Sequence, residues 1–130
     1  MTLETQPLEL SLIDAGTQVG SGVGFAPPWV SYIAMVGGEP AGTCGFKSAP
    51  DAESVEIAYY TFPGFEGRGV ATEMTAQLLA LAGHAHPGAI AVAQTLVERN
   101  ASHRVLEKLG FDCIGTIGNA DDVVLEWQRP

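Results

Sequence analysis

The clearest chemical information in this sequence lies in residues 64–72, whose sequence is Gly-Phe-Glu-Gly-Arg-Gly-Val-Ala-Thr. A strand-like run at residues 55–62 precedes this segment, and an amphipathic helical run at residues 70–82 follows it. A glycine-rich turn between a strand and a helix leaves backbone N–H groups unpaired at the positive end of the helix dipole. Such a turn binds phosphate without a dedicated cationic side chain. The segment therefore predicts a phosphorylated ligand.

The length and composition of the chain are those of one soluble domain. The 130 residues are 46% hydrophobic and 16% charged, which is enough apolar material for a core. No apolar run approaches the ~20 residues of a membrane span. Residues 1–7 lack the positive start and apolar centre of a signal peptide. We expect a single cytoplasmic domain over residues 1–130, with no membrane partner.

Six Lys+Arg against fifteen Asp+Glu give a formal charge of −9. This charge disfavours nucleic acid, which needs a basic surface. It suits a cationic partner such as an amine or a basic peptide, although acidity that only aids solubility explains it equally well.

Cys44 and Cys113 lie far apart without a CxxC motif, so we predict buried free thiols. His84 and His86 have no carboxylate cluster beside them, and we predict no metal site.

Periodicity and turn residues indicate the elements that must position the glycine segment. They predict strands at residues 8–13, 29–36, 41–47, 55–62 and 89–97, a helix at 70–82, a short helix between Asn100 and Gly110, and a final hairpin of strands at 111–117 and 123–128. Gly37-Gly38 predicts a two-residue hairpin turn, and residues 16–28 predict a loop. Residues 89–97 are nearly all apolar, which predicts a strand covered on both faces. The order indicates an α/β or α+β layered sandwich.

Two motifs in this order carry a family resemblance. The first is Glu66-Gly67-Arg68-Gly69-Val70-Ala71, and the second, in residues 94–111, ends in Asn-x-Ser-x-x-x-x-Glu-Lys-Leu-Gly-Phe. They lie about thirty residues apart with a strand between them. The first resembles the Gln/Arg-x-x-Gly-x-Gly/Ala phosphate motif of the GCN5-related N-acetyltransferase (GNAT) superfamily. The second is similar to its ribosomal-protein N-terminal acetyltransferase branch, and the match covers roughly residues 29–128.

The resemblance implies a mixed, mostly antiparallel sheet of about seven strands with a central helix and a short C-terminal helix. It also implies acetyl-CoA as co-substrate. The strands at 55–62 and 89–97 would splay apart, and pantetheine would enter the gap and pair with the backbone of residues 58–62. A backbone amide after the splay, near Phe62, would polarise the thioester carbonyl. The implied cofactor-binding residues are Tyr60, Thr61, Phe62, Gly67, Arg68, Gly69, Val70, Ala71, Thr72, Asn100 and Ser102.

The same resemblance implies two catalytic residues, Glu56 and Ser102. An amine must lose a proton before it attacks a thioester, and Glu56 would serve as the general base, directly or through water. A solvent-facing glutamate is the alternative interpretation. Ser102 would lie near the cofactor thiol, or else be an ordinary serine in the first turn of a helix. Asn100 would lie near the pantetheine arm, cap the helix, or do both.

This sequence departs from the family pattern at three places. Leu106 stands where the family usually has a tyrosine general acid, and leucine donates no proton. Glu66 replaces the first Gln or Arg, so either it points away from the phosphate or cofactor affinity is modest, with Arg68 as a compensating charge. Residues 14–28 contain too much glycine and proline for the family's two acceptor helices. The acceptor side would then be reduced and would depend on a partner subunit, for which a homodimer is the simplest form.

The resemblance predicts an acetyl-CoA-dependent N-acetyltransferase acting on a primary amine of a small molecule or a peptide N-terminus. The alternative is a catalytically degenerate acyl-CoA-binding module, which Leu106 and the missing acceptor helices favour. A nucleotide-binding or phosphate-sensing domain of another fold rests on the glycine turn alone.

Overall fold

A computed structural model describes residues 9–14, 28–47, 50, 53–98, 100–119 and 122–129. The elements are β1 (Leu10–Asp14), β2 (Ser31–Val36), β3 (Glu39–Phe46), β4 (Ser54–Thr61), α2 (Val70–Ala85), β5 (Ile90–Leu96), α3 (Ala101–Lys108), β6 (Asp112–Asn119) and β7 (Asp122–Arg129). The predicted strands, both predicted helices and the hairpin at Gly37-Gly38, where both φ angles are positive, are confirmed. The predicted loop at residues 16–28 lies almost wholly outside the described residues.

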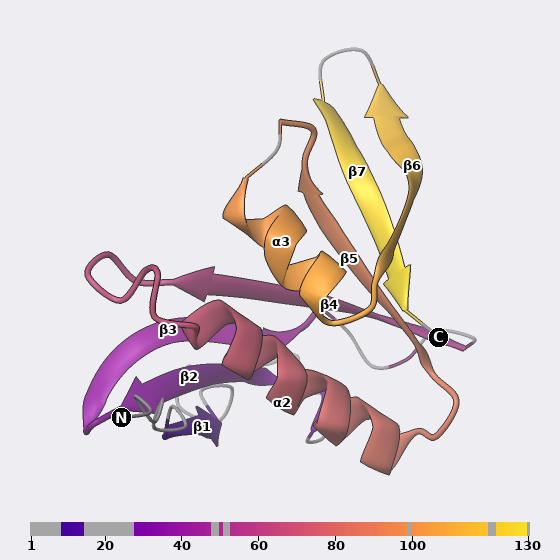
Figure 1. The fold of residues 1–130 in the computed structure, drawn as a ribbon. Helices are drawn as coiled ribbons and strands as arrows, with labels where there is room; N and C mark the ends of the chain where they lie inside the picture. Colours follow the sequence, from indigo (N-terminus) through magenta and orange to yellow (C-terminus); the bar gives the residue numbers. More distant parts are fainter. Residues whose placement is uncertain are drawn as a thin grey trace, which may run out of the picture.

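Seven strands form one sheet in the order β1-β2-β3-β4-β5-β7-β6. Every neighbouring pair is antiparallel except β4 and β5, which are parallel. The β4–β5 pairing covers only Ser54–Ile90, Val55–Ala91 and Glu56–Val92. Beyond Glu56 the two strands diverge, so that β4 runs nearly level in Figure 1 while β5 climbs steeply away from it. The predicted mixed, mostly antiparallel sheet and its splay are therefore confirmed.

Helix α2 covers one face of the first half of the sheet, where it contacts β1, β3 and β4 (Figure 1). Its buried stripe includes Met74 and Leu78, which are fully enclosed and contribute about 1.5–3 kcal/mol each through burial. Gly42 of β3 has no room for a side chain, because a Cβ there would collide with the Tyr60 carbonyl oxygen and lie 3.1 Å from the Met74 Cε atom. Residues 42, 44 and 46 thus face α2, and residues 43, 45 and 47 face the opposite side of the sheet.

Helix α3 is attached to the second half of the sheet, beyond the splay. The ring of His103 lies 5.4 Å from that of Trp127 on β7, and its Nε2 atom lies 2.8 Å from the Leu96 carbonyl oxygen at the end of β5. Trp127 in turn donates its Nε1–H to Thr95 Oγ1 at 2.9 Å. The gap between β4 and β5 therefore lies between the half of the sheet that α2 covers and the half to which α3 is attached, and both halves contribute to one hydrophobic core.

Three predictions about packing are wrong. Helix α2 continues through Gly83 to Ala85, because a single glycine weakens a helix without interrupting its hydrogen bonds. Strand β5 is buried on one face only: Leu96 is 67% exposed, since β4 has diverged from it by that point. Cys44 is buried, but Cys113 is exposed because β6 is an edge strand. Among the described residues, no helix combines the length and apolar character needed to cross a bilayer.

Candidate functional site

The glycine segment forms an open turn at the start of α2. Gly69 caps the helix in the left-handed region, with φ of 81°, and no side chain accepts a hydrogen bond from the first turn. Gly67 also has a positive φ, 74°, and a Cβ on either glycine would meet nothing within 4 Å. Backbone conformation, and not crowding, requires glycine at both positions. The free N–H groups and the helix dipole point into open space, which fits an anionic phosphate.

A groove of about 430 Å³ lies between this turn, the end of β4 and the first turns of α3, and we call it the α2–α3 groove. It brings together eight of the predicted site residues: Tyr60, Thr61, Gly67, Gly69, Val70, Ala71, Thr72 and Ser102. Its lining also contains Tyr59, which the sequence analysis included only within the backbone of residues 58–62, and Arg104 and Lys108, which it did not select. Arg68, Phe62 and Asn100 border the groove without lining it, and Glu56 lies elsewhere.

Alternate residues of β4 direct their main-chain groups into the gap where β4 and β5 diverge. Phe62 donates its N–H to the Ala41 carbonyl at 2.8 Å, and the Glu56 carbonyl accepts from Lys47 N–H at 2.9 Å. Even-numbered residues of β4 thus pair with β3, and alternation turns the main-chain groups of Tyr59 and Thr61 toward the gap. The Phe62 amide is therefore already engaged, and the polarising amide expected near Phe62 stays a prediction for a neighbouring residue. Tyr60 and Phe62 likewise have no main-chain group facing the gap.

Asn100 and Ser102 begin α3. The Asn100 Oδ1 atom accepts from Ser102 N–H at 2.8 Å, and its Nδ2 donates to the Glu98 carbonyl at 3.2 Å, so the predicted helix cap is confirmed. Ser102 is half-buried and lines the groove. Leu106, at the family's tyrosine position, is fully buried, and its side chain has no proton to donate.

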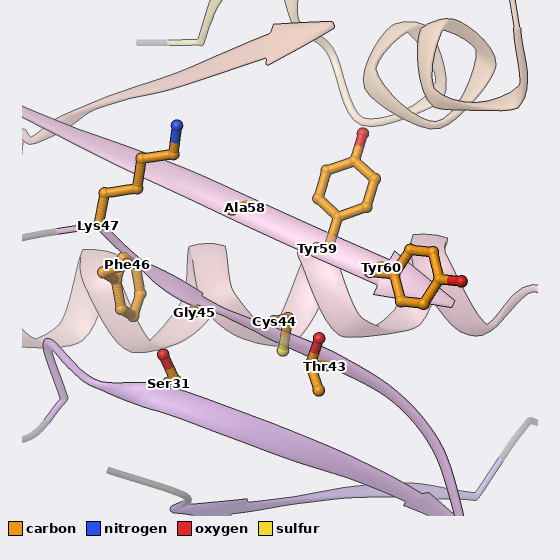
Figure 2. A pocket seen from close by; sticks show the side chains of 9 residues that line it. All are labelled: Ser31, Thr43, Cys44, Gly45, Phe46, Lys47, Ala58, Tyr59 and Tyr60. Atoms are coloured by element: carbon orange, nitrogen blue, oxygen red, sulfur yellow. The ribbon is translucent and has the colours of Figure 1, made fainter. Parts of the chain in front are cut away.

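Tyr59 reaches across the splay from β4 to α3. Its hydroxyl donates to the Ser102 carbonyl oxygen at a long 3.4 Å, and Figure 2 shows its ring directed away from β3 toward that helix. Burial raises the pKa of Tyr59, and the contact with Ser102 opposes part of that rise. The phenol is therefore protonated at neutral pH and can donate a hydrogen bond within the groove. The sequence analysis included Tyr59 only through the backbone of residues 58–62 and assigned no role to its hydroxyl, because only the splay brings that hydroxyl to Ser102.

The charges around the α2–α3 groove differ from those that the sequence suggested. Glu66 is among the residues that line the groove, so an acidic residue lies beside the candidate phosphate site. Arg68 is not among the residues that line the groove, but its guanidinium lies 5.1 Å from the centre of the ring of Phe65, which does line it. The cations in the lining are Arg104 and Lys108, which are four residues apart and therefore on one side of α3.

Glu56 lies on the sheet face opposite α2, at the last paired position before the splay. Its Oε2 atom is 2.8 Å from Lys47 Nζ. Within the described chain that oxygen is buried and makes no well-directed hydrogen bond, so the Lys47 ammonium is its electrostatic partner. Beside this pair runs a second groove of about 560 Å³, the sheet-face groove, whose labelled side chains appear in Figure 2.

The cysteines do not add a nucleophile to either groove. Cys44 borders the sheet-face groove, but burial raises its pKa to about 12, so it remains a neutral thiol. Among the described residues, no group of three or more His, Cys, Asp or Glu side chains is arranged to hold a metal ion.

Comparison with known proteins identifies the family. Residues 18–112 match the acetyltransferase (GNAT) domain family, and the chain belongs to it. No curated protein sequence matches the chain.

Among solved structures, the chain resembles RimL, a ribosomal L7/L12 alpha-N-protein acetyltransferase in complex with coenzyme A, with a TM-score of 0.70 and 20% identity over 77% of this chain and 60% of that one. It resembles the aminoglycoside acetyltransferase AAC(6')-Ib in complex with coenzyme A with a TM-score of 0.66 and 20% identity, over 77% and 65% of the two chains. A GNAT-family acetyltransferase from Bordetella pertussis gives a TM-score of 0.62 and 25% identity, over 78% and 65%. The chain spans about three fifths of the length of the first of these proteins.

Proposed function

We propose that this protein is an acetyl-CoA-dependent N-acetyltransferase that acylates a primary amine of a small molecule or a peptide N-terminus. The observation that carries the proposal is the continuity of the α2–α3 groove, which joins a phosphate-binding turn to the unpaired edge of β4. That edge leads to Glu56 at the point where the strands part. Family membership and the coenzyme A bound to RimL and to AAC(6')-Ib support the same assignment.

The residues of the groove fit the parts of this co-substrate. The amides of residues 67–71 would hold its pyrophosphate, and Arg104 and Lys108 would offset the charge of Glu66. The main-chain groups of Tyr59 and Thr61 would pair with the pantetheine arm, as a neighbouring strand would. Asn100 would hold the start of α3 in place beside it.

Bound acetyl-CoA would supply an activated acyl group as a thioester. Glu56 would take a proton from the acceptor ammonium, directly or through water, and so free the nitrogen lone pair. A C–N bond then forms, the C–S bond breaks, and the nitrogen loses its second proton while the departing sulfur takes one up, so that a neutral amide and a thiol result. Tyr59 and Ser102 lie where a hydroxyl could donate a hydrogen bond to that sulfur. Because a thiol has a pKa of ~8.5, the sulfur needs little help to depart, which is compatible with leucine at position 106.

We extend the proposal to the setting of the enzyme: a single domain over residues 1–130, in the cytoplasm, as a homodimer. Free Cys44 and Cys113 are consistent with a reducing compartment. Strand β6 supports the dimer, because it is a sheet edge with Ile114 and Ile117 exposed, and such an edge can pair with another strand.

The test is acetyl-CoA turnover, measured by release of free thiol against amino acids, polyamines, aminoglycosides and peptide N-termini, together with thermal stability in acetyl-CoA. We expect acetyl-CoA to raise the melting temperature and at least one acceptor to release thiol. Stabilisation without turnover by any acceptor would favour a non-catalytic acyl-CoA-binding module. A shift no larger than that from inorganic phosphate would contradict the assignment.

A further inference from the structure

Lys47 is an isolated cation beside the candidate base. Residues 1–67 contain eight Asp and Glu residues but only this one Lys or Arg. In the structure its Nζ atom lies 2.8 Å from Glu56 Oε2, on the sheet face opposite α2. The net charge of the protein attracts cations from a distance, but the side chain nearest to the candidate base adds a local positive charge.

The sheet-face groove is built from successive cross-strand neighbours of β3 and β4. Thr43 pairs with Tyr60 at one end, and Gly45 pairs with Ala58 in the middle. Gly45 has no room for a side chain, because a Cβ there would lie 2.7 Å from the Ser31 Cα atom. The two small residues leave a hollow floor, and Figure 2 shows Lys47 and Tyr60 at opposite ends of it. The volume of about 560 Å³ suits a small molecule.

The Lys47–Glu56 pair can exchange its cation. The Lys47 side chain is 53% exposed, so its ammonium can move toward solvent, whereas the Glu56 Oε2 atom is buried and needs another cation in its place. Lys47 is also itself a primary ammonium in contact with a carboxylate. It therefore occupies, relative to Glu56, the position that an acceptor ammonium must take to lose its proton.

From this arrangement we propose that the acceptor is a free α-amino acid, whose ammonium replaces Lys47 at Glu56 and whose carboxylate binds the displaced Lys47 ammonium. The inference rests on the proposed function and names its acceptor class. An exchange with a zwitterion keeps both charges of the protein paired. A polyamine would instead leave Lys47 without a counter-ion beside a second cation, and a peptide N-terminus carries an amide where the carboxylate would be.

The experiment uses the 130-residue chain and matched acceptors. These are glycine, alanine, serine, leucine and phenylalanine, each with its C-terminal amide, together with spermidine and a serine-initiated tetrapeptide. Thiol release gives kcat/KM for each acceptor with wild type, Lys47→Met and Lys47→Arg. Ligand-observed NMR on the protein loaded with coenzyme A gives binding of the same acceptors without turnover. Circular dichroism establishes that each variant is folded.

We expect the best amino acid to exceed its amide by about tenfold or more in kcat/KM, the effect of one charge-assisted contact. Lys47→Met should reduce this ratio to near one, and Lys47→Arg should retain it. If the amides or spermidine give the wild type a kcat/KM equal to or higher than that of the amino acids, the inference is overturned, but the acetyltransferase function stays intact. An unchanged ratio in Lys47→Met, or a preference for the tetrapeptide, would overturn it as well.

Absence of turnover with every acceptor would count against the proposed function instead. In that case NMR still decides the inference: amino-acid binding that Lys47→Met removes supports the zwitterion site, and equal binding of the amides rejects it.

Discussion

The two grooves that meet at β4 are built for recognition by different means. The α2–α3 groove presents backbone N–H groups from one continuous segment, where glycines with positive φ hold the turn open. The sheet-face groove presents side chains from three strands, with an ion pair at one end. A site made of backbone N–H groups depends only on local conformation, so consecutive residues encode it. A side-chain site across strands depends on register and on which face each residue occupies.

The largest expected effect tests the backbone site. Gly69→Asp adds a side chain and an anion at the helix start, and it should remove most of the thermal stabilisation by acetyl-CoA. Gly88→Asp is a matched control, since Gly88 has a φ of 87° and equally open surroundings but lies at the other end of α2. Both variants should lose similar intrinsic stability, and only the first should lose the response to acetyl-CoA. An equal loss in both would show that the turn has no part in binding.

The next effect tests the side-chain site. Glu56→Gln should lower turnover by about 10²-fold, because the acceptor must then release its proton to bulk water. For the same reason the pH–rate profile should move to higher pH, while acetyl-CoA binding stays unchanged. Glu53→Gln, an exposed carboxylate just before β4, serves as the control and should leave the rate unaffected. If the rate and the pH profile of Glu56→Gln equal those of the wild type, Glu56 is not the general base.

Tyr59 lines both grooves, and its removal tests how they are coupled. Tyr59→Phe should lower kcat by about tenfold with little change in acetyl-CoA affinity, since proton donation only assists a leaving group that is already acidic. Tyr32→Phe removes another phenol that donates to a main-chain carbonyl, that of Pro28 at 2.8 Å, and should leave kcat as it is. If Tyr59→Phe weakens binding without affecting kcat, the hydroxyl only positions α3.

The smallest effect concerns Glu66. Glu66→Gln removes an anion from the α2–α3 groove, so acetyl-CoA affinity should stay level or rise by about twofold to threefold, with the larger gain at low ionic strength. Isothermal titration at two salt concentrations measures this affinity, with Glu39→Gln as control, because Glu39 is an exposed carboxylate of the β2–β3 hairpin that lines neither groove. A tenfold loss of affinity would mean that Glu66 contacts the ligand directly.

The sequence predicted most of the fold because its signals are local. The stripe of Val70, Met74 and Leu78 marked the buried face of α2, and Asn100 and Gly110 marked the ends of α3. The errors arose where burial depends on distant neighbours. Leu96 and Cys113 have apolar or neutral character that suggests a core, but the splay and the sheet edge leave both exposed.

The sequence by itself determined the glycine turn, the helix that begins at Val70 and the family to which the chain belongs, because each is encoded in contiguous residues whose backbone preferences are strong. Only the tertiary structure decided that Lys47 meets Glu56, that Tyr59 reaches Ser102 and that the Phe62 amide is already occupied. Each of these contacts follows from strand register, from the alternation of faces or from the divergence of β4 and β5. These are properties of paired strands, and no single stretch of the chain carries them.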